Sequence, residues 1–411
     1  MSSIKSRNPG AAVQFDYLFT MDNPGNEYRY GELLDMATEQ IVHLDESGFG
    51  TLWQGEHHFG GEGFEINPNP IMAGAYVAGI TKNLRIGTGA VTPPFWHPIR
   101  LAEDLALLDQ MSKGRLDIGV ARGIQQREFM NFNPEADRRT DEDRNWRYFL
   151  EQLEVVKKAW TMEGFSHSGE FFTFPNGNVQ DGATWYPRNP LWRAEDGEYV
   201  GMSIIPKPYQ KPYPAMWNLL DKTPGFIRSA QERMNVITWL RSREGLREVM
   251  TAYEETLAET LGHDVPRGTG TSLMRMVYVA ETDEQAEREA RQLIEDLFNY
   301  VGGVRPRDIF ANPGEKLTDE EQTGSWWKFL FPREHLFIGS PETVREQIAH
   351  LNGEYGVDRL VLWSWIPGLT QEQVMRSNRL FVDEVMPHFP GAAIPSIKPE
   401  MPEGFGPLTG D

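Results

Sequence analysis

Short apolar runs alternate with amphipathic stretches along most of the chain, and this alternation constrains the fold more than any other feature. An apolar run and the helically spaced stretch that follows it recur roughly every 35 residues. We count eight such pairs, with candidate strands at 11–20, 49–54, 84–91, 115–123, 215–220, 235–240, 273–280 and 358–364. Regular alternation implies parallel strands joined by helical crossovers. Because an open sheet rarely reaches eight regular repeats, the sequence predicts an α/β fold, a (β/α)8 TIM barrel.

Two long irregular segments interrupt this alternation. Residues 164–213, after strand 4 and its helix, and residues 301–340, after strand 7 and its helix, are rich in Pro, Gly and aromatic residues. Because loops of this length are uncommon unless they serve binding, we expect both to be insertions or lids within one domain spanning 1–411. Their aromatic side chains fit an apolar or ring-containing substrate, and packing of a long loop explains them equally well. Residues 390–411 are predicted to form an extended C-terminal tail.

Composition excludes several classes of protein. A formal charge of −20 disfavours nucleic acid and anionic membranes as partners, so a phosphate-bearing ligand needs a local cluster of basic groups. No apolar run of about 18 residues predicts a membrane span, and the N-terminus lacks the apolar region of a secretory signal. The absence of cysteine excludes disulfides and thiolate sites and fits a cytoplasmic protein. No Gly-x-Gly-x-x-Gly follows the first strand, so a Rossmann nucleotide site lacks its signature.

The sequence Gly55-Glu56-His57-His58-Phe59 stands where the second strand passes into a loop. Loops that follow strands carry the chemistry of α/β proteins. At a strand end, neighbouring side chains point to opposite sides, so only one of the two histidines is expected to face a pocket. Taken alone, the pair is as well explained by two solvated histidines on a surface loop. Adjacent histidines do not converge on one ion, so no metal site is predicted.

Three pieces of the sequence resemble the bacterial luciferase-like, flavin-dependent monooxygenase family. They are Glu56–Phe59, Gly87–Ala90 with the following His97-Pro98, and the block Arg100–Gly123. The resemblance implies that reduced FMN binds at the C-terminal mouth of the barrel and reacts with O2 to give a C4a-peroxyflavin. One oxygen atom then enters an apolar organic substrate such as an aldehyde, a ketone or a ring compound. It also implies a homodimer, and because no NAD(P)H-binding motif is visible, a separate flavin reductase is expected to supply FMNH2.

The resemblance also assigns the site residues. His57 matches the family's catalytic histidine, a general acid or base, and His58 is expected to turn away and hold the loop. Ala121 stands where luciferase has a reactive cysteine, which indicates a monooxygenase relative rather than a luciferase. The expected cofactor-binding residues are Gly89 and Ala90, which match a cis peptide under the flavin ring, the phosphate-binding Arg122 and Arg147, the phosphate loop Asp221, Lys222 and Thr223, and the pocket residue Trp239.

Some assignments have competitors. Arg139 and Arg144 compete with Arg147, an ordinary salt bridge would account for Arg122, and Trp239 is equally well explained as a core residue. Lys222 departs from the Ser/Thr residues usual in the family's phosphate loop. Three other functions share the barrel: a deazaflavin-dependent oxidoreductase, a non-catalytic flavin-binding barrel and a divalent-metal hydrolase. The last lacks enough carboxylate and histidine ligands at the strand ends.

Overall fold

A computed structural model of the protein describes residues 12–177, 189–195, 197–239, 241–303, 305–390 and 396–401. Within these residues, no helix combines the length and the apolar character that crossing a membrane requires. Parts of three sequence predictions lie outside the described residues. They concern the aromatic pair Trp185 and Tyr186 in the first insertion, Leu240 at the end of the sixth strand, and most of the C-terminal tail.

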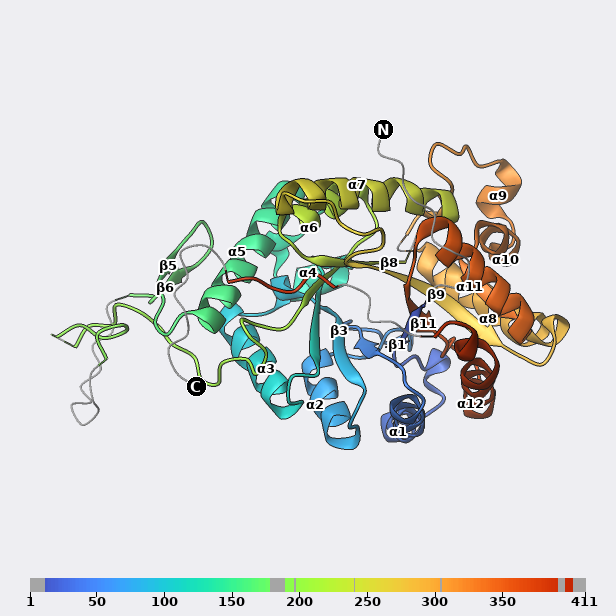
Figure 1. Ribbon diagram of the computed structural model, residues 1–411, viewed down its shortest axis with the longest axis horizontal. Coiled ribbons are helices and arrows are strands. Elements are labelled where there is room, and N and C mark those ends of the chain that lie inside the picture. The colour runs from blue at the N-terminus through green and yellow to red at the C-terminus, as the bar shows by residue number, and fades with distance from the viewer. Residues whose placement is uncertain are drawn as a thin grey trace.

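Eight parallel strands close into a barrel, as the sequence predicts (Figure 1). Adjacent strands pair in the order in which they occur in the sequence, and β11 pairs with β1 to close the ring. Their side chains are almost all buried because the barrel interior and the surrounding helices cover both faces. The barrel strands are β1 (Gln14–Phe19), β2 (Thr51–Gln54), β3 (Arg85–Val91), β4 (Leu116–Val120), β7 (Met216–Leu219), β8 (Asn235–Thr238), β9 (Thr271–Val279) and β11 (Arg359–Trp363).

Helices surround the barrel, and those of nine residues or more occupy the stretches that the apolar periodicity predicts (Figure 1). Several begin at residues suited to the role, such as Asn69, whose side chain accepts hydrogen bonds from the first turn of α2. The helices are α1 (Tyr30–Glu46), α2 (Pro70–Ile80), α3 (Pro98–Met111), α4 (Gln126–Phe132), α5 (Glu142–Thr161), α6 (Thr223–Gln231), α7 (Arg243–Leu261), α8 (Asp283–Gly302), α9 (Asp319–Thr323), α10 (Trp326–Leu330), α11 (Pro341–Tyr355) and α12 (Gln371–Leu380).

Several short elements within the loops and insertions were not predicted. The first insertion contains the hairpin β5 (His167–Ser168) and β6 (Thr173–Phe174), and the second contains α9, α10 and β10 (Leu336–Gly339). The outer half of β9 extends past its barrel neighbours and pairs with β10. Strands this short carry little periodic signal, so the sequence alone does not reveal them.

The described residues of the first insertion pack against the outside of the barrel. It begins after α5, and a segment that follows a helix leaves from the N-terminal end of the strands, opposite the mouth. Lys207 Nζ donates to the carbonyl oxygens of Ala159 and Met162 at the end of α5, at 2.6 and 2.7 Å. Phe171 packs edge-on against Tyr148 of α5. Figure 1 shows β5 and β6 beside α5. The described part of this insertion therefore lies along α5, and its interpretation as a lid stays a prediction.

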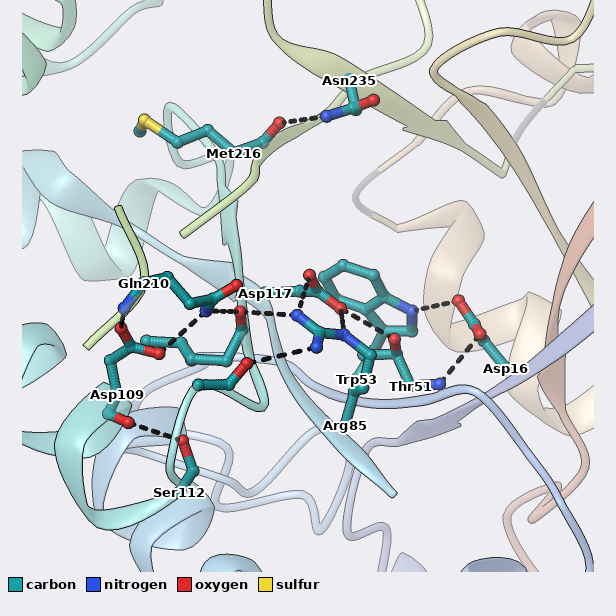
Figure 2. A network of polar contacts seen from close by, with 12 residues as sticks. Asp16, Thr51, Trp53, Arg85, Asp109, Ser112, Asp117, Gln210, Met216 and Asn235 are labelled. Atoms are coloured by element: carbon teal, nitrogen blue, oxygen red, sulfur yellow. Dashed lines mark hydrogen bonds and ion pairs between the residues drawn. The ribbon is translucent and has the colours of Figure 1, made fainter. Parts of the chain in front are cut away.

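A buried polar network ties the starts of several strands together at the base of the barrel (Figure 2). Asp16 accepts hydrogen bonds from the Thr51 amide and from Trp53 Nε1, both at 2.9 Å. Arg359 Nε lies 2.7 Å from Asp16, and both side chains are almost fully buried. Arg85 pairs with Asp117 at 2.8 Å. The Thr51 hydroxyl donates to Asp117 at 2.9 Å, so five strands are cross-linked at the end of the barrel opposite the mouth, where polar contacts serve stability.

Replacing Arg359 with methionine should lower the free energy of unfolding by about 3–5 kcal/mol, because the buried Asp16 carboxylate loses its charged partner. The shift of the urea midpoint measures this effect. Arg100→Met is the matched control: Arg100 is 65% exposed and pairs only with helical neighbours, so its loss should cost below about 1 kcal/mol. Equal midpoints for the two variants would show that the buried pair does not stabilise the barrel.

Candidate active site

A cavity of about 610 Å³ opens at the carboxyl ends of the barrel strands. This is the end of a TIM barrel where active sites are built. Residues from the ends of seven of the eight barrel strands, or from the loops just after them, line it, among them Thr20, His57, Ala90, Arg122, Asp221, Trp239 and Trp363. The predicted residues that the structure brings together here are therefore His57, Gly89, Ala90, Arg122, Asp221, Lys222 and Trp239.

His57 projects into this cavity between two carboxylates. Its Nδ1 lies 3.3 Å from Oε1 of Glu128, which is almost fully buried, and its Nε2 lies 3.7 Å from Oε2 of Glu65. The backbone amide of His57 donates to the Asn67 carbonyl at 3.0 Å, and Asn67 in turn donates to the Gly55 carbonyl at 2.9 Å. Both the imidazole ring and the loop that carries it are thus held in place.

The two carboxylates determine the charge of His57. Burial alone would lower its pKa, but Glu65 and Glu128 outweigh burial and raise the pKa to about 9. At neutral pH the side chain is therefore an imidazolium in which both ring nitrogens carry a proton. Of the two roles open to a histidine, proton donor and proton acceptor, this environment favours the donor.

His58 turns away from the cavity, as the alternation along a strand end predicts. Its Nε2 lies 3.0 Å from Oε1 of Glu56. The Glu56 carboxylate also accepts hydrogen bonds from the Thr92 amide at 2.7 Å and from Trp96 Nε1 at 2.9 Å. These contacts connect the loop after β2 with the segment after β3, and they give His58 a supporting position.

Gly89 and Ala90 lie at the end of β3, and the peptide bond between them is cis, as predicted. Both residues line the cavity floor close to Gly55. With side chains no larger than a methyl group, they leave the backbone open to a flat ligand. This matches the small-residue surface expected beneath a flavin ring.

Basic side chains gather at one end of the cavity. Arg122 Nη2 lies 2.7 Å from Oε1 of Glu142, and Arg138 Nε lies 3.3 Å from Oε2 of the same carboxylate. The guanidinium groups of Arg122 and Arg228 both lie over the ring of Trp146, at 4.0 and 4.8 Å from its centroid. Burial and repulsion from Arg138 lower the pKa of Arg122 to about 10, so it stays charged at neutral pH. The Glu142 carboxylate shows that an anion is accommodated between two of these arginines.

The start of α6 adds to this basic end. Lys222 precedes the helix and lines the cavity together with Pro224, Gly225 and Arg228. Thr223 was predicted to bind the phosphate, but it is not among the described residues that line the cavity. Its hydroxyl donates a hydrogen bond to Glu248 at 2.8 Å. Asp221 accepts hydrogen bonds from the Trp239 amide at 3.0 Å and from the Thr238 hydroxyl at 3.1 Å. It therefore joins the ends of β7 and β8 instead of facing a phosphate directly.

Arg147 is not brought to the cavity. It lies on the exposed side of α5 and pairs with Glu170 of the first insertion at 2.9 Å. Glu142 and Trp146, four residues apart on α5, face the cavity, and a step of one residue turns the side chain by about 100°. The competing residues Arg139 and Arg144 do not line the cavity either, whereas Arg138 does. The structure thus places Arg138 at the cavity and Arg147 outside it.

Trp239 lines the cavity and also joins a cluster of aromatic rings beneath the second insertion. Its ring centroid lies 5.3 Å from that of Trp363 and 6.0 Å from that of Phe310. Arg305, Pro306 and Ile309 of the second insertion line the cavity as well. The second insertion, unlike the first, therefore contributes to the wall of the site.

Sequence reasoning missed much of the cavity wall, including four charged residues that are prominent in the site: Glu65, Glu128, Arg138 and Arg228. Arg228 had a usable signal, since it stands four residues after Pro224 and so on the same face of a predicted helix. The other three lie in loops or in a short helix and reach the site only through tertiary packing. Among the described residues, no group of three or more His, Cys, Asp or Glu side chains is placed to hold a metal ion.

Comparison with known proteins decides the family. The sequence profile of the luciferase-like monooxygenases matches residues 13–359. The chain belongs to this family. This luciferase-like monooxygenase is 28% identical over 383 residues to the oxygenase component of a flavin-dependent trigonelline monooxygenase from Acinetobacter baylyi. That match covers 92% of the chain and 96% of the relative.

Solved structures confirm the fold of this luciferase-like monooxygenase. The oxygenating constituent of 3,6-diketocamphane monooxygenase from Pseudomonas putida, in complex with FMN, aligns with a TM-score of 0.71 at 20% identity over 92% of the chain and 98% of that structure. A coenzyme F420-dependent tetrahydromethanopterin reductase from Methanopyrus kandleri aligns with a TM-score of 0.59 at 16% identity, over 92% of the chain and 100% of that structure. The shared barrel fold therefore does not show whether the cofactor is a flavin or a deazaflavin.

Proposed function

We propose that this luciferase-like monooxygenase is the oxygenase component of a two-component system and uses reduced FMN delivered by a separate flavin reductase. The observation that carries the proposal is a single cavity with a basic cluster at one end and the imidazolium of His57 elsewhere on its wall. The relative from Acinetobacter baylyi is itself named an oxygenase component, which supports the division into two proteins.

The cavity residues fit FMN. Arg122, Arg138 and Arg228 would hold the phosphate together with Lys222, and they form a concentrated positive region in a chain whose formal charge is −20. A cavity of about 610 Å³ lies in the range typical of small-molecule sites. When bound in its reduced form, FMN supplies the two electrons that reduce one atom of O2 to water while the other atom enters the organic substrate.

The chain's own residues then position the reactants and deliver a proton. Glu65 and Glu128 keep His57 protonated, so that its N–H groups stabilise developing negative charge on oxygen or donate a proton to it. The rings of Trp239 and Trp363 provide an apolar wall for an organic substrate and limit the access of water. Asp221 holds the Trp239 backbone and so fixes this wall relative to the end of β7.

A homodimer is part of the proposal. Large apolar side chains are exposed on the adjacent helices α2 and α3, namely Met72, Tyr76, Leu107 and Met111, with Met72 reaching 72% exposure. Large exposed apolar side chains on neighbouring helices suit a surface that is covered in an assembly. Sedimentation of the purified protein measures the oligomeric state. A sequence without cysteine fits the cytoplasmic location that we propose for the enzyme.

The test is a single-turnover experiment. FMN is photoreduced and bound to the protein without oxygen, and the complex is then mixed with 18O2 and a panel of aldehydes, ketones and ring compounds. One labelled oxygen atom should appear in the product of at least one of these compounds, as detected by mass spectrometry. A parallel sample with reduced deazaflavin separates the alternative function. Hydride transfer from the deazaflavin, with no 18O in any product of the FMN sample, would replace the proposed monooxygenase by a deazaflavin-dependent oxidoreductase.

A further inference from the structure

We propose that Arg305 is the carboxylate-binding residue of the substrate site and that the enzyme acts on small planar ring compounds that carry a carboxylate. This inference rests on the proposed function, which it narrows from apolar organic substrates to organic anions. It starts from an arginine of the second insertion that lines the cavity, as Asp221, Trp239, Pro306, Ile309 and Trp363 also do.

Arg305 lies at the mouth of the barrel and forms no close ion pair within the described part of the chain. Its Nη1 lies 3.7 Å from Oδ2 of Asp221, which is longer than a hydrogen bond, and this is the one carboxylate recorded within 4 Å of it among the described residues. The other oxygen of Asp221 accepts from the Trp239 amide and the Thr238 hydroxyl. The side chain is only 22% exposed. A guanidinium has five N–H donors, so most of them remain available to a ligand in the cavity.

The surfaces around Arg305 suit a flat ring. The guanidinium carbon lies 5.6 Å from the centroid of Trp239, and Trp363 packs edge-on against Trp239. The wall therefore places the guanidinium donors of Arg305 beside the apolar faces of Trp239 and Trp363.

The wall that Arg305 and Trp239 form faces the part of the mouth where His57 lies, so a ligand bound to this wall would extend toward His57. In the strand order of the barrel, β2, which precedes His57, and β8, which precedes Trp239, are on opposite sides. A ring anchored at Trp239 by its carboxylate thus extends across the mouth toward His57. Arg305 is close enough to His57 for its charge to oppose protonation of the imidazole. A bound carboxylate would neutralise that charge and favour the protonated form of His57.

Arg305 shares no side-chain contact with the basic cluster of Arg122, Arg138 and Arg228 among the described residues. Arg122 and Arg228 share the ring of Trp146, and Arg122 and Arg138 share the carboxylate of Glu142. Arg305 takes part in none of these contacts and lies in the second insertion, whereas the three arginines of the basic cluster lie outside both insertions. FMN and the substrate carboxylate are accordingly expected to use separate arginines.

The experiment measures binding by isothermal titration calorimetry to the full chain, with and without excess oxidised FMN. The probes are two isosteric pairs, benzoate with benzamide and nicotinate with nicotinamide. We expect the carboxylates to bind about tenfold or more tightly than their amides, and Arg305→Gln to abolish this preference without changing the FMN affinity. Arg305→Lys should keep part of the preference. Arg291→Gln, an exposed arginine on α8 that pairs with Glu287, is the matched control and should behave like the parent protein.

The outcomes separate this inference from the proposed function. Equal affinity for acid and amide, no binding of either carboxylate, or an unchanged preference in Arg305→Gln overturns the carboxylate site even if oxygen transfer to neutral substrates is observed. If Arg305→Gln lowers the FMN affinity but keeps the preference for carboxylates, Arg305 binds the cofactor, and this result also overturns the proposed carboxylate site. If the preference for carboxylates depends on Arg305 but no oxygen transfer is observed, the carboxylate site is supported. The monooxygenase proposal is then contradicted by the 18O2 experiment alone.

Discussion

Replacing His57 with alanine should lower product formation by about 10²–10⁴-fold while leaving the affinity for FMN unchanged, because a positioned proton donor contributes this much to catalysis. His57 lies between Glu65 and Glu128 and is the cavity residue whose charge state is set by neighbours to donate a proton. Product formed per reduced FMN in single turnover measures the effect, and quenching of tryptophan fluorescence reports FMN binding. An exposed histidine, His350 on α11, is the control and should be replaceable without loss.

The pH dependence tests the same assignment from another side. The raised pKa of about 9 means that the imidazolium is present below that pH and is lost as pH rises through it, so product formation should fall on the alkaline side near pH 9. Glu128→Gln removes one of the carboxylates that raise this pKa, so the fall should move to lower pH. If His57→Ala keeps full activity, or if the alkaline fall does not move in Glu128→Gln, His57 does not act as the proton donor.

The barrel was predictable because each of its parts leaves a local signal. Strands covered on both faces read as apolar runs, and helices packed on one side read as amphipathic stretches, so the eight strand–helix pairs could be counted. In the second insertion, apolar periodicity no longer predicts the elements. β10 has four residues and pairs with the outer half of β9, a contact between segments about 60 residues apart in the chain. Pairings of this kind are set by tertiary structure and leave no periodicity to read.

The site was predictable to the extent that its residues stand directly at strand ends. His57, Arg122, Asp221 and Trp239 meet because parallel strands bring their carboxyl ends to one edge. Residues on helices and loops were less certain, since a side chain one position away on a helix faces a different direction. Arg147 shows this, because it pairs with Glu170 outside the cavity while its neighbour Trp146 faces inward.

The position of the first insertion was also beyond local reasoning. Its aromatic residues suggested a lid, but three of them, Phe171, Phe172 and Phe174, make ring contacts with Tyr148 of α5 or with His97 at the start of α3. Composition alone does not distinguish an aromatic ring that contacts a substrate from one that packs a loop onto a helix. What does distinguish them is chain order: an insertion that follows a helix starts at the opposite end of the barrel from one that follows a strand.

The double replacement Arg122→Gln with Arg228→Gln should weaken FMN binding by about 10²–10⁴-fold, because each charged hydrogen-bonding group contributes roughly 1.5–3 kcal/mol. Both guanidinium groups lie over Trp146 at the basic end of the cavity, and glutamine keeps much of their packing while removing the charge. The measurement is an FMN titration followed by fluorescence at two salt concentrations. The parent affinity should fall with added salt, and this dependence should be smaller in the double variant.

Riboflavin makes this prediction specific, since it has the same ring system as FMN and no phosphate. Its affinity should be almost the same in the parent and in the double variant, so the loss should appear for FMN alone. Arg147→Gln is the matched arginine control, because Arg147 pairs with Glu170 on the exposed side of the same helix that carries Trp146. Equal losses for FMN and riboflavin would mean that the double variant has damaged the ring site. Unchanged FMN binding would mean that the basic cluster serves some other anion, and the proposed orientation of the cofactor in the barrel would then be wrong.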